Sequence, residues 1–253
     1  HGACRVEALD IVPITLTSET VVLYFHGGAF VFGSPNTHAA MVAQLGKRLG
    51  ARAVVPKYRL APEAVFPAAV IDARAAWDGL IASGVRPGQI VIGGDSAGGC
   101  LALQLLRELI ADKADLPAGV FCFSPVSDLT FKSESFRRNA AIEAVLSADR
   151  ASEMMALYLV DHPPDASDAS PINGDFKGSP PVWITAGDTE ILFDDAQGMA
   201  TRIKEQGGTV NLVEKRDLPH VWPLFHNVLP EGRQTLDDLA GWIRQLPHAQ
   251  DEN

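Results

Sequence analysis

Short β-branched or aromatic runs alternate along this chain with glycine-rich turns and longer stretches of helical spacing. From Thr20 onward the order repeats several times. It is typical of parallel strands joined by crossover helices, so we predict an α/β fold with a mostly parallel sheet and helices on both faces. The predicted strands cover residues 21–25, 51–56, 89–93, 118–123, 182–186 and 209–213, and the predicted helices cover 37–49, 68–82, 97–111, 194–206 and 232–246.

Length and charge narrow the classes of partner. The 253 residues suit one large domain with a sizeable core. Because 21 Lys and Arg stand against 31 Asp and Glu, without a basic cluster, we expect no nucleic-acid partner. No apolar stretch approaches the roughly 20 residues that span a bilayer, so we expect no membrane insertion.

The cysteine pattern gives a further expectation about the cellular compartment. The three cysteines, Cys4, Cys100 and Cys122, are an odd number and lack metal-ligand spacing. No charged leader followed by an apolar segment opens the chain. We therefore expect a cytoplasmic protein with free, buried thiols and no bound metal.

One proline-rich stretch, residues 124–180, interrupts the alternation of strands and helices. It holds a helical piece at 148–160 and is too long for a plain connection. It is either a long surface excursion or a cap over a site at the sheet edge, and we favour the cap. The chain is then divided into a core of residues 1–123 and 181–253 and a cap of residues 124–180.

A GxSxG element at residues 94–98 marks a candidate nucleophile. It follows a predicted buried strand and precedes a predicted helix, and its glycines stand where a sharp turn has no room for a Cβ atom. Such a turn lifts the Ser96 hydroxyl above the sheet edge and leaves the Ala97 amide at the positive end of the helix. A phosphate-binding turn is disfavoured because the element matches neither GxGxxG nor GxxxxGK[ST].

Consecutive glycines after the first predicted strand supply a second set of backbone donors. We predict that the amides of Gly28, Ala29 and Ala97 form an oxyanion hole, which stabilises negative charge on a reacting oxygen, and that Gly27 shapes its turn. We expect the adjacent His26 to fix this loop by hydrogen bonds rather than to transfer protons.

A serine nucleophile needs a histidine to take its proton and a carboxylate to orient that histidine. His220 follows the last predicted strand and is the predicted base; His226 lies in an apolar run, and His248 lies in a polar terminal segment that we expect to be mobile. The acid should follow strand 182–186. There Asp188 and Glu190 fit equally well, while Asp194 and Asp195 suit the first turn of a helix.

Six motifs occur together in a fixed order. They are HGGAF at 26–30, YRLAPE at 58–63, GDSAGG at 94–99, SPVSDLT at 124–130, GDTEILFDD at 187–195 and LPHVWPLF at 218–225. From about residue 20 to about residue 245 the chain resembles the bacterial hormone-sensitive-lipase-like esterases, a branch of the α/β-hydrolase superfamily. The resemblance selects Glu190 as the acid of a triad with Ser96 and His220, and it implies that Arg59 and Glu63 brace loops beside the site.

The resemblance also implies a function, namely serine carboxylesterase activity on small esters with acyl chains of up to roughly six or eight carbons, without a metal or cofactor. A lactone hydrolase or an N-acetyl deacetylase would use the same residues. A non-catalytic ligand receptor is disfavoured because Ser96, Glu190 and His220 are intact. Many of these relatives are dimers, which leaves a homodimer open without fixing the oligomeric state. Since the chain starts just before the first strands, we also expect the relatives' helical N-terminal cap segment to be absent.

Overall fold

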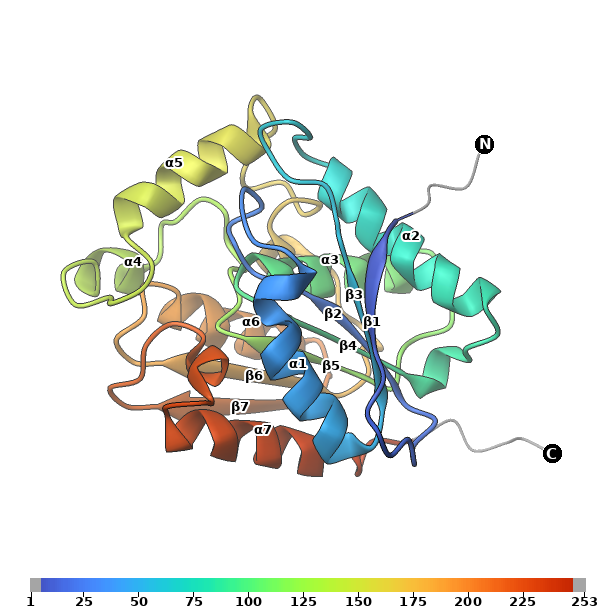
Figure 1. The fold of residues 1–253 in the computed structure, drawn as a ribbon. Coiled ribbons are helices and arrows are strands. Elements are labelled where there is room, and N and C mark those ends of the chain that lie inside the picture. The colour runs from blue at the N-terminus through green and yellow to red at the C-terminus, as the bar shows by residue number, and fades with distance from the viewer. Residues whose placement is uncertain (1–5, 248–253) are drawn as a thin grey trace.

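Seven strands form one sheet at the centre of the computed structural model, which describes residues 6–247 (Figure 1). The spatial order is β1-β3-β2-β4-β5-β6-β7; β1 pairs antiparallel with β3, and all other neighbouring pairs are parallel. This confirms the predicted α/β fold with a mostly parallel sheet. The strands are β1 (Ala8–Ile11), β2 (Val21–Phe25), β3 (Arg52–Pro56), β4 (Ile90–Asp95), β5 (Gly119–Phe123), β6 (Val182–Gly187) and β7 (Val210–Lys215).

Seven α-helices accompany the sheet in the described residues. They are α1 (Pro35–Leu49), α2 (Ala68–Ala82), α3 (Ala97–Ala111), α4 (Glu134–Arg138), α5 (Ala148–Leu159), α6 (Phe193–Glu205) and α7 (Pro230–Ile243). The bounds of α2 and α3 equal the predicted ones. Helix α1 begins two residues before its predicted start because Pro35 occupies its first position and the Thr37 hydroxyl accepts a hydrogen bond from the Ser34 amide at 3.1 Å.

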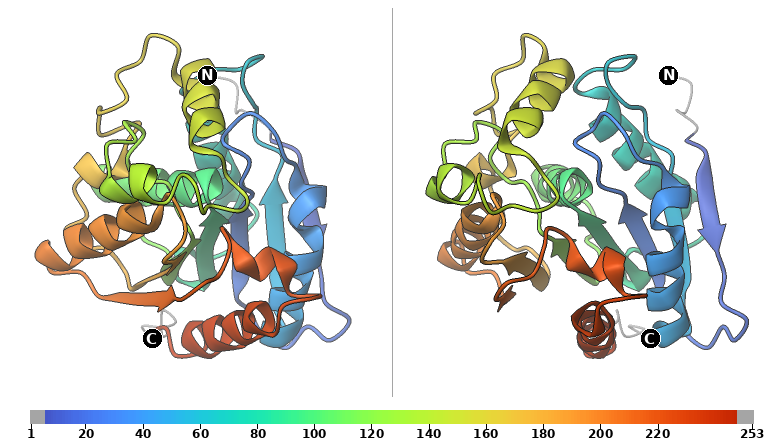
Figure 2. Two further views of the ribbon diagram at one scale, coloured as in Figure 1. Left: turned by 90° about the vertical axis from the view of Figure 1, so that its left-hand side faces the viewer. Right: turned by 60° about the vertical axis from the view of Figure 1, so that its left-hand side comes forward.

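Both faces of the sheet are buried, which explains the continuous apolar runs in its central strands. In β2, Val22 and Tyr24 point to the face covered by α1 and α7, while Leu23 and Phe25 point to the face covered by α2, α3 and α6. The helices flank the sheet on both sides in Figures 1 and 2. The helices on both faces hold the sheet in place, and the candidate site lies at its carboxyl edge.

The sequence pattern predicts neither β1 nor α4. Strand β1 has four residues, is only partly buried and joins the sheet edge through β3, with the Lys57 amide donating to the Glu7 carbonyl at 2.8 Å. Helix α4 has five residues, fewer than a periodic pattern needs to be visible. Both elements depend on contacts with distant parts of the chain.

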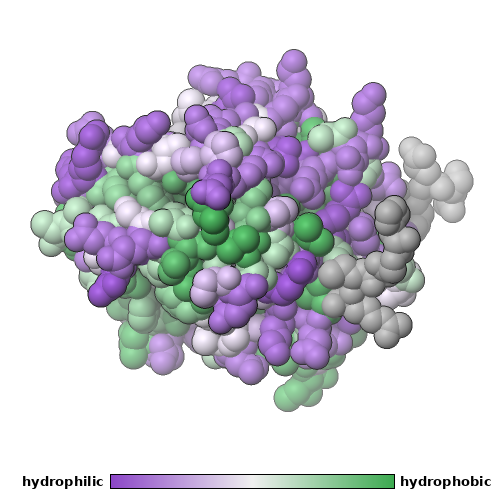
Figure 3. Space-filling view, turned by 90° about the horizontal axis from the view of Figure 1, so that it is seen from above, coloured by the Kyte–Doolittle hydropathy of each residue, from purple (hydrophilic) through white to green (hydrophobic). Residues whose placement is uncertain are grey.

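Residues 124–180 cross the carboxyl edge of the sheet and contain α4 and α5 (Figure 1). Helix α5 packs Met155 and Tyr158 inward, and the Tyr158 ring stacks on Phe30 with 4.0 Å between ring centroids. Seen from above, apolar side chains are exposed among polar ones on this side of the molecule (Figure 3). The segment thus lies beside the loop that follows β2, the position a cap requires.

None of the helices in residues 6–247 is both long enough and apolar enough to cross a lipid bilayer.

Candidate active site

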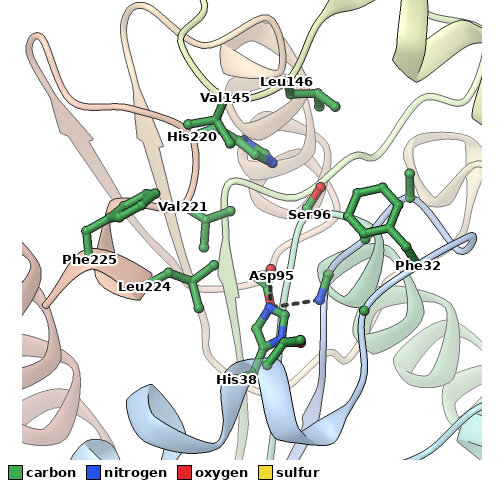
Figure 4. A pocket seen from close by; sticks show the side chains of 15 residues that line it. Phe32, His38, Asp95, Ser96, Val145, Leu146, His220, Val221, Leu224 and Phe225 are labelled. Atoms are coloured by element: carbon green, nitrogen blue, oxygen red, sulfur yellow. Dashed lines mark hydrogen bonds and ion pairs between the residues drawn. The ribbon is translucent and has the colours of Figure 1, made fainter.

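Ser96 sits on a sharp turn between β4 and α3. Its backbone has φ 52° and ψ −118°, a conformation that residues other than glycine rarely adopt. Two glycines permit the turn: a Cβ atom on Gly94 would lie 2.2 Å from the Gly98 carbonyl oxygen, and one on Gly98 would lie 2.0 Å from the Phe25 carbonyl oxygen. The GxSxG spacing therefore follows from close strand–helix contact, and it directs the Ser96 side chain into a cavity at the sheet edge (Figure 4).

His220 lines the same cavity from the loop after β7, and its imidazole faces the Ser96 hydroxyl (Figure 4). The other side of the ring meets a carboxylate: His220 Nδ1 lies 2.6 Å from Glu190 Oε2. Glu190 is fully buried, and its Oε1 accepts hydrogen bonds from the Gly187 amide at 2.6 Å and the Ser124 hydroxyl at 2.8 Å. Both carboxylate oxygens are thus engaged, which fixes the orientation of the carboxylate and of the imidazole beside it.

The charge of Glu190 changes the acidity of His220. Burial alone would lower the pKa of His220, but the hydrogen bond that His220 donates to Glu190 and the negative charge of Glu190 outweigh burial and raise the pKa above its ordinary value of 6.5. Glu143 and Asp95 add smaller contributions in the same direction. The surroundings therefore favour the protonated imidazole, the form that exists after a histidine has taken a proton from serine.

The other carboxylates near β6 have different partners. Asp188 Oδ1 accepts from the Asp217 amide at 2.8 Å, and Asp194 Oδ2 accepts from the Ser135 amide at 2.7 Å. Of the two candidates that residue spacing left open, Asp188 and Glu190, the structure brings Glu190 to His220. His226 is half-buried, with Nδ1 3.3 Å from the Pro223 carbonyl, and His248 lies outside the described residues.

The loop after β2 approaches Ser96 with its backbone. Gly28 has φ +121° and Ala29 has φ +52°, and the Gly28 carbonyl accepts from the amides of Val31 and Phe32, both at 3.0 Å. The amides of Gly28, Ala29 and Ala97 make no hydrogen bond within residues 6–247. They are therefore free to donate to a bound oxygen, as an oxyanion hole requires. The Gly27 amide is already used, because it donates to Asp95 Oδ1 at 2.9 Å.

Asp95 and His38 form a second histidine–carboxylate pair, which sequence reasoning missed. Asp95 is buried directly before Ser96, and its Oδ2 lies 3.2 Å from His38 Nε2 (Figure 4). Burial favours neutral forms of both residues, but their mutual attraction outweighs it, lowering the pKa of Asp95 and raising the pKa of His38. The contact therefore favours the charged forms of both residues. The only sequence feature that could have indicated this pair is a histidine at a core-facing position of the helix after the HGGAF loop.

His26 has the supporting role expected of it. Its Nδ1 lies 2.7 Å from the Gly27 carbonyl, its ring stacks on Tyr58 at 4.3 Å between centroids, and Tyr58 donates to its carbonyl at 2.7 Å. Burial lowers the pKa of His26 to about 4, so the ring is neutral at pH 7.

The expected brace around Arg59 needs a correction. Arg59 pairs with the buried Asp72 of α2, with Nη2 2.7 Å from Oδ1. Glu63, which the resemblance also expected to brace a loop, is exposed and makes no hydrogen bond to the described part of the chain. Asp72, which the sequence did not suggest, is buried and accepts hydrogen bonds from both the side chain and the amide of Arg59.

The cysteines and the side chains that could bind a metal ion are the remaining candidates for function. Cys100 and Cys122 are free and buried, as predicted, while Cys4 lies outside the described residues. Within residues 6–247 no group of three or more histidine, cysteine, aspartate or glutamate side chains is arranged to hold a metal ion.

A parallel sheet with a serine on the turn after β4 and a histidine on the loop after β7 defines a class, the α/β hydrolases. Comparison with known proteins agrees: the family described as alpha/beta hydrolase fold matches residues 22–224. The chain belongs to this family, which confirms the expected superfamily and fold.

Particular relatives narrow the class. An acetyl-hydrolase from Streptomyces hygroscopicus is 38% identical over 223 residues, 88% of this chain and 75% of that protein. An esterase from Acinetobacter venetianus is 33% identical over 227 residues, 89% of this chain and 75% of that protein. A solved esterase of the bacterial hormone-sensitive lipase family has a TM-score of 0.92 at 37% identity and covers 97% of this chain and 86% of its own. The predicted membership of this esterase branch and of the carboxylesterase class is confirmed.

Proposed function

We propose that this protein is a serine esterase that hydrolyses small carboxylic esters through an acyl-enzyme. One observation carries the proposal: Ser96 and His220 face each other across one cavity while Glu190 holds the far nitrogen of His220 at 2.6 Å. The names of the relatives, an acetyl-hydrolase and esterases, support the same chemistry.

In the first half of the reaction, His220 Nε2 takes the proton of Ser96 as Oγ attacks the ester carbonyl carbon. Negative charge then gathers on the carbonyl oxygen, where the unpaired amides of Gly28, Ala29 and Ala97 can donate to it. One such preorganised donor is typically worth about 3 to 4 kcal/mol of barrier. The bond to the alcohol oxygen breaks as His220 returns the proton to it.

In the second half, water replaces the alcohol. His220 removes a proton from water as its oxygen attacks the acyl carbon, and Ser96 leaves with the proton that His220 returns. Glu190 takes no proton in either half. Its role is to orient the imidazole and stabilise its positive charge, for which its two further hydrogen bonds, from Gly187 and Ser124, prepare it.

Residues 124–180 act as a cap over this chemistry, while residues 1–123 and 181–253 carry the catalytic groups. The Glu143 carboxylate supports this division because it joins the two parts. Its Oε1 accepts from the Val145 amide at 2.9 Å, and its Oε2 accepts from the Ile191 amide at 3.1 Å, one residue beyond Glu190. The cap loop that carries Val145 and Leu146 is thereby held over the cavity.

Covalent labelling tests the proposal directly. Phenylmethylsulfonyl fluoride should add one sulfonyl group to the wild-type chain, mapped to Ser96 by peptide mass spectrometry, and abolish hydrolysis of p-nitrophenyl acetate. Ser96→Ala should be neither labelled nor active while keeping the wild-type circular dichroism spectrum. Labelled Ser96 with activity only on lactones or on N-acetyl amides would replace the ester substrate; an active Ser96→Ala variant would refute the mechanism.

A further inference from the structure

Ser96 lies where two cavities of very different size meet. The first has a volume of about 270 Å³ and includes His220, Leu224 and Phe225 from the loop after β7. The second has a volume of about 20 Å³ and includes Phe131, Ala151 and Met155 from the segment 124–180. Ala29, Ser96 and Leu146 line both cavities, so the two cavities adjoin at the serine.

The position of His220 determines which half of an ester each cavity accepts. The alcohol oxygen must receive its proton from His220, and His220 lines the first cavity but not the second. Ser96 and Ala29 line both cavities and Ala97 lines the second, so the reacting carbonyl group is held where the two cavities meet. With the alcohol oxygen next to His220 in the first cavity, the acyl chain points away from His220 and into the second cavity.

We infer that the preferred substrates are acetate esters of bulky apolar alcohols. This inference rests on the proposed function and specifies its substrate class. A volume of about 20 Å³ exceeds only slightly the roughly 10 to 15 Å³ that one water-sized group requires. An acetyl methyl group fits it, whereas each further methylene must displace a wall.

The walls of the small cavity are well supported. Ala151 and Met155 are buried one helical turn apart on α5, where they face the same side. The Phe131 ring stacks on Phe136 with 4.5 Å between ring centroids and 11° between planes. Enlarging the cavity therefore requires moving packed side chains rather than a free rotamer.

The large cavity suits an apolar alcohol. Phe32, Leu224 and Phe225 contribute apolar side chains to it, and Val145 and Leu146 cover it from the cap (Figure 4). Thr37 and His38 lie at its α1 end, and His38 is already paired with Asp95. Burial of an alkyl or aryl group against these side chains strengthens binding of the alcohol half.

Hydrolysis of such a substrate needs water as its only other reactant. The Ser96 oxygen forms a bond to the acetyl carbon, the bond to the alcohol oxygen breaks, and the alcohol leaves with the serine proton passed on by His220. Water then splits the acetyl-enzyme into acetate and free Ser96.

Two orthogonal substrate series test the inference. In the first, p-nitrophenyl acetate, propionate, butyrate and hexanoate vary the acyl chain with a constant leaving group. In the second, ethyl, butyl, hexyl and 2-cyclohexylethyl acetate vary the alcohol with a constant acyl group. The hydrolysis rate of these esters is measured from the acid released at constant pH. We expect kcat/KM to fall at least about tenfold from acetate to butyrate, since one methylene in an apolar pocket is worth about 10- to 200-fold. Along the second series kcat/KM should rise. A flat acyl series, or falling values along the alcohol series, would overturn the inference.

Matched variants assign each series to its cavity. Met155→Ala should raise kcat/KM for butyrate relative to acetate by about tenfold and leave the order of the alkyl acetates unchanged. Leu224→Ala should do the reverse, weakening the preference for large alcohols and leaving the acyl order unchanged. If Met155→Ala does not fold, Ala151→Val provides the opposite test by reducing activity on propionate more than on acetate. Failure of sulfonyl labelling at Ser96 would instead show that the proposed function itself is wrong.

Discussion

His38 Nε2 lies 3.2 Å from Asp95 Oδ2, and Asp95 immediately precedes the candidate nucleophile in the chain. The other oxygen of Asp95 accepts from the Gly27 amide at 2.9 Å and the Tyr24 hydroxyl at 2.7 Å. One buried carboxylate therefore connects α1, β2, the loop after β2 and the turn that carries Ser96. The attraction of His38 offsets the desolvation cost of burying the Asp95 carboxylate.

Removing the hydrogen bond between His38 and Asp95 should disturb the loop after β2 without removing a reacting group. For His38→Leu we expect kcat on p-nitrophenyl acetate to fall about 100-fold, because small misplacements of reacting groups have effects of that order. KM should change little. The conservative His38→Gln variant, which can still donate to Asp95, should recover most of kcat. Equal losses in both variants, or a change confined to KM, would contradict this positioning role.

The two carboxylates that follow β6 should differ sharply on substitution. Glu190→Gln should lower kcat by about 10⁴-fold, because the amide can donate to Nδ1 and favour the wrong tautomer of His220. Asp188→Asn should lower kcat less than about threefold, because Asp188 accepts from the Asp217 amide and does not touch His220. Steady-state rates of the two variants, each checked for wild-type melting temperature, decide the assignment. The opposite ranking would transfer the acid role to Asp188.

The raised pKa of His220 predicts the acid limb of the pH profile. Only neutral His220 can take the Ser96 proton, so activity is lost as the pH falls through the pKa. Because Glu190 holds that pKa above 6.5, half-maximal kcat/KM on the acid side should lie above pH 6.5. In Glu190→Gln the charge is lost, and the residual activity should have its acid limb at lower pH. Profiles measured at constant ionic strength would test this, and an unshifted limb would contradict it.

Local sequence signals were sufficient to predict the central strands and the sharp turn that carries Ser96. Strands β2, β4, β5 and β6 are short apolar runs buried on both faces, and the turn at Ser96 has two glycines at positions where a Cβ atom would collide with the backbone. Residue spacing could not choose between Asp188 and Glu190, since both follow β6 within three residues and only the fold shows which reaches His220. The resemblance to esterases made that choice.

Interactions between distant residues explain what was missed. His38 and Asp95 are 57 positions apart, and nothing near either residue indicates that they pair. Arg59 and Asp72 likewise meet only when α2 packs beside the loop after β3. Strand β1 is too short and too exposed to produce a clear alternating pattern and is defined by its antiparallel register with β3.

Asp195, which is not one of the proposed reacting groups, should make the stability of the fold depend on pH. It is buried in the first turn of α6, and its Oδ2 accepts from the amides of Ser127 and Asp128 at 2.8 and 2.9 Å. Burial outweighs these two hydrogen bonds and raises the pKa of Asp195 from 3.8 to about 7. Between these two values the folded chain holds a proton that the unfolded chain has released.

The free energy of unfolding should therefore decrease as the pH rises from about 4 to about 7. A pKa difference of this size corresponds to up to about 4 kcal/mol. Asp195→Asn keeps an oxygen for the two amides but cannot ionise, so urea unfolding of this variant between pH 5 and 8 should lack this contribution and show a higher stability than wild type at pH 8. Asp194→Asn, at the neighbouring position, is the control and should retain the slope. If wild type and Asp195→Asn have parallel curves, Asp195 does not titrate in this range.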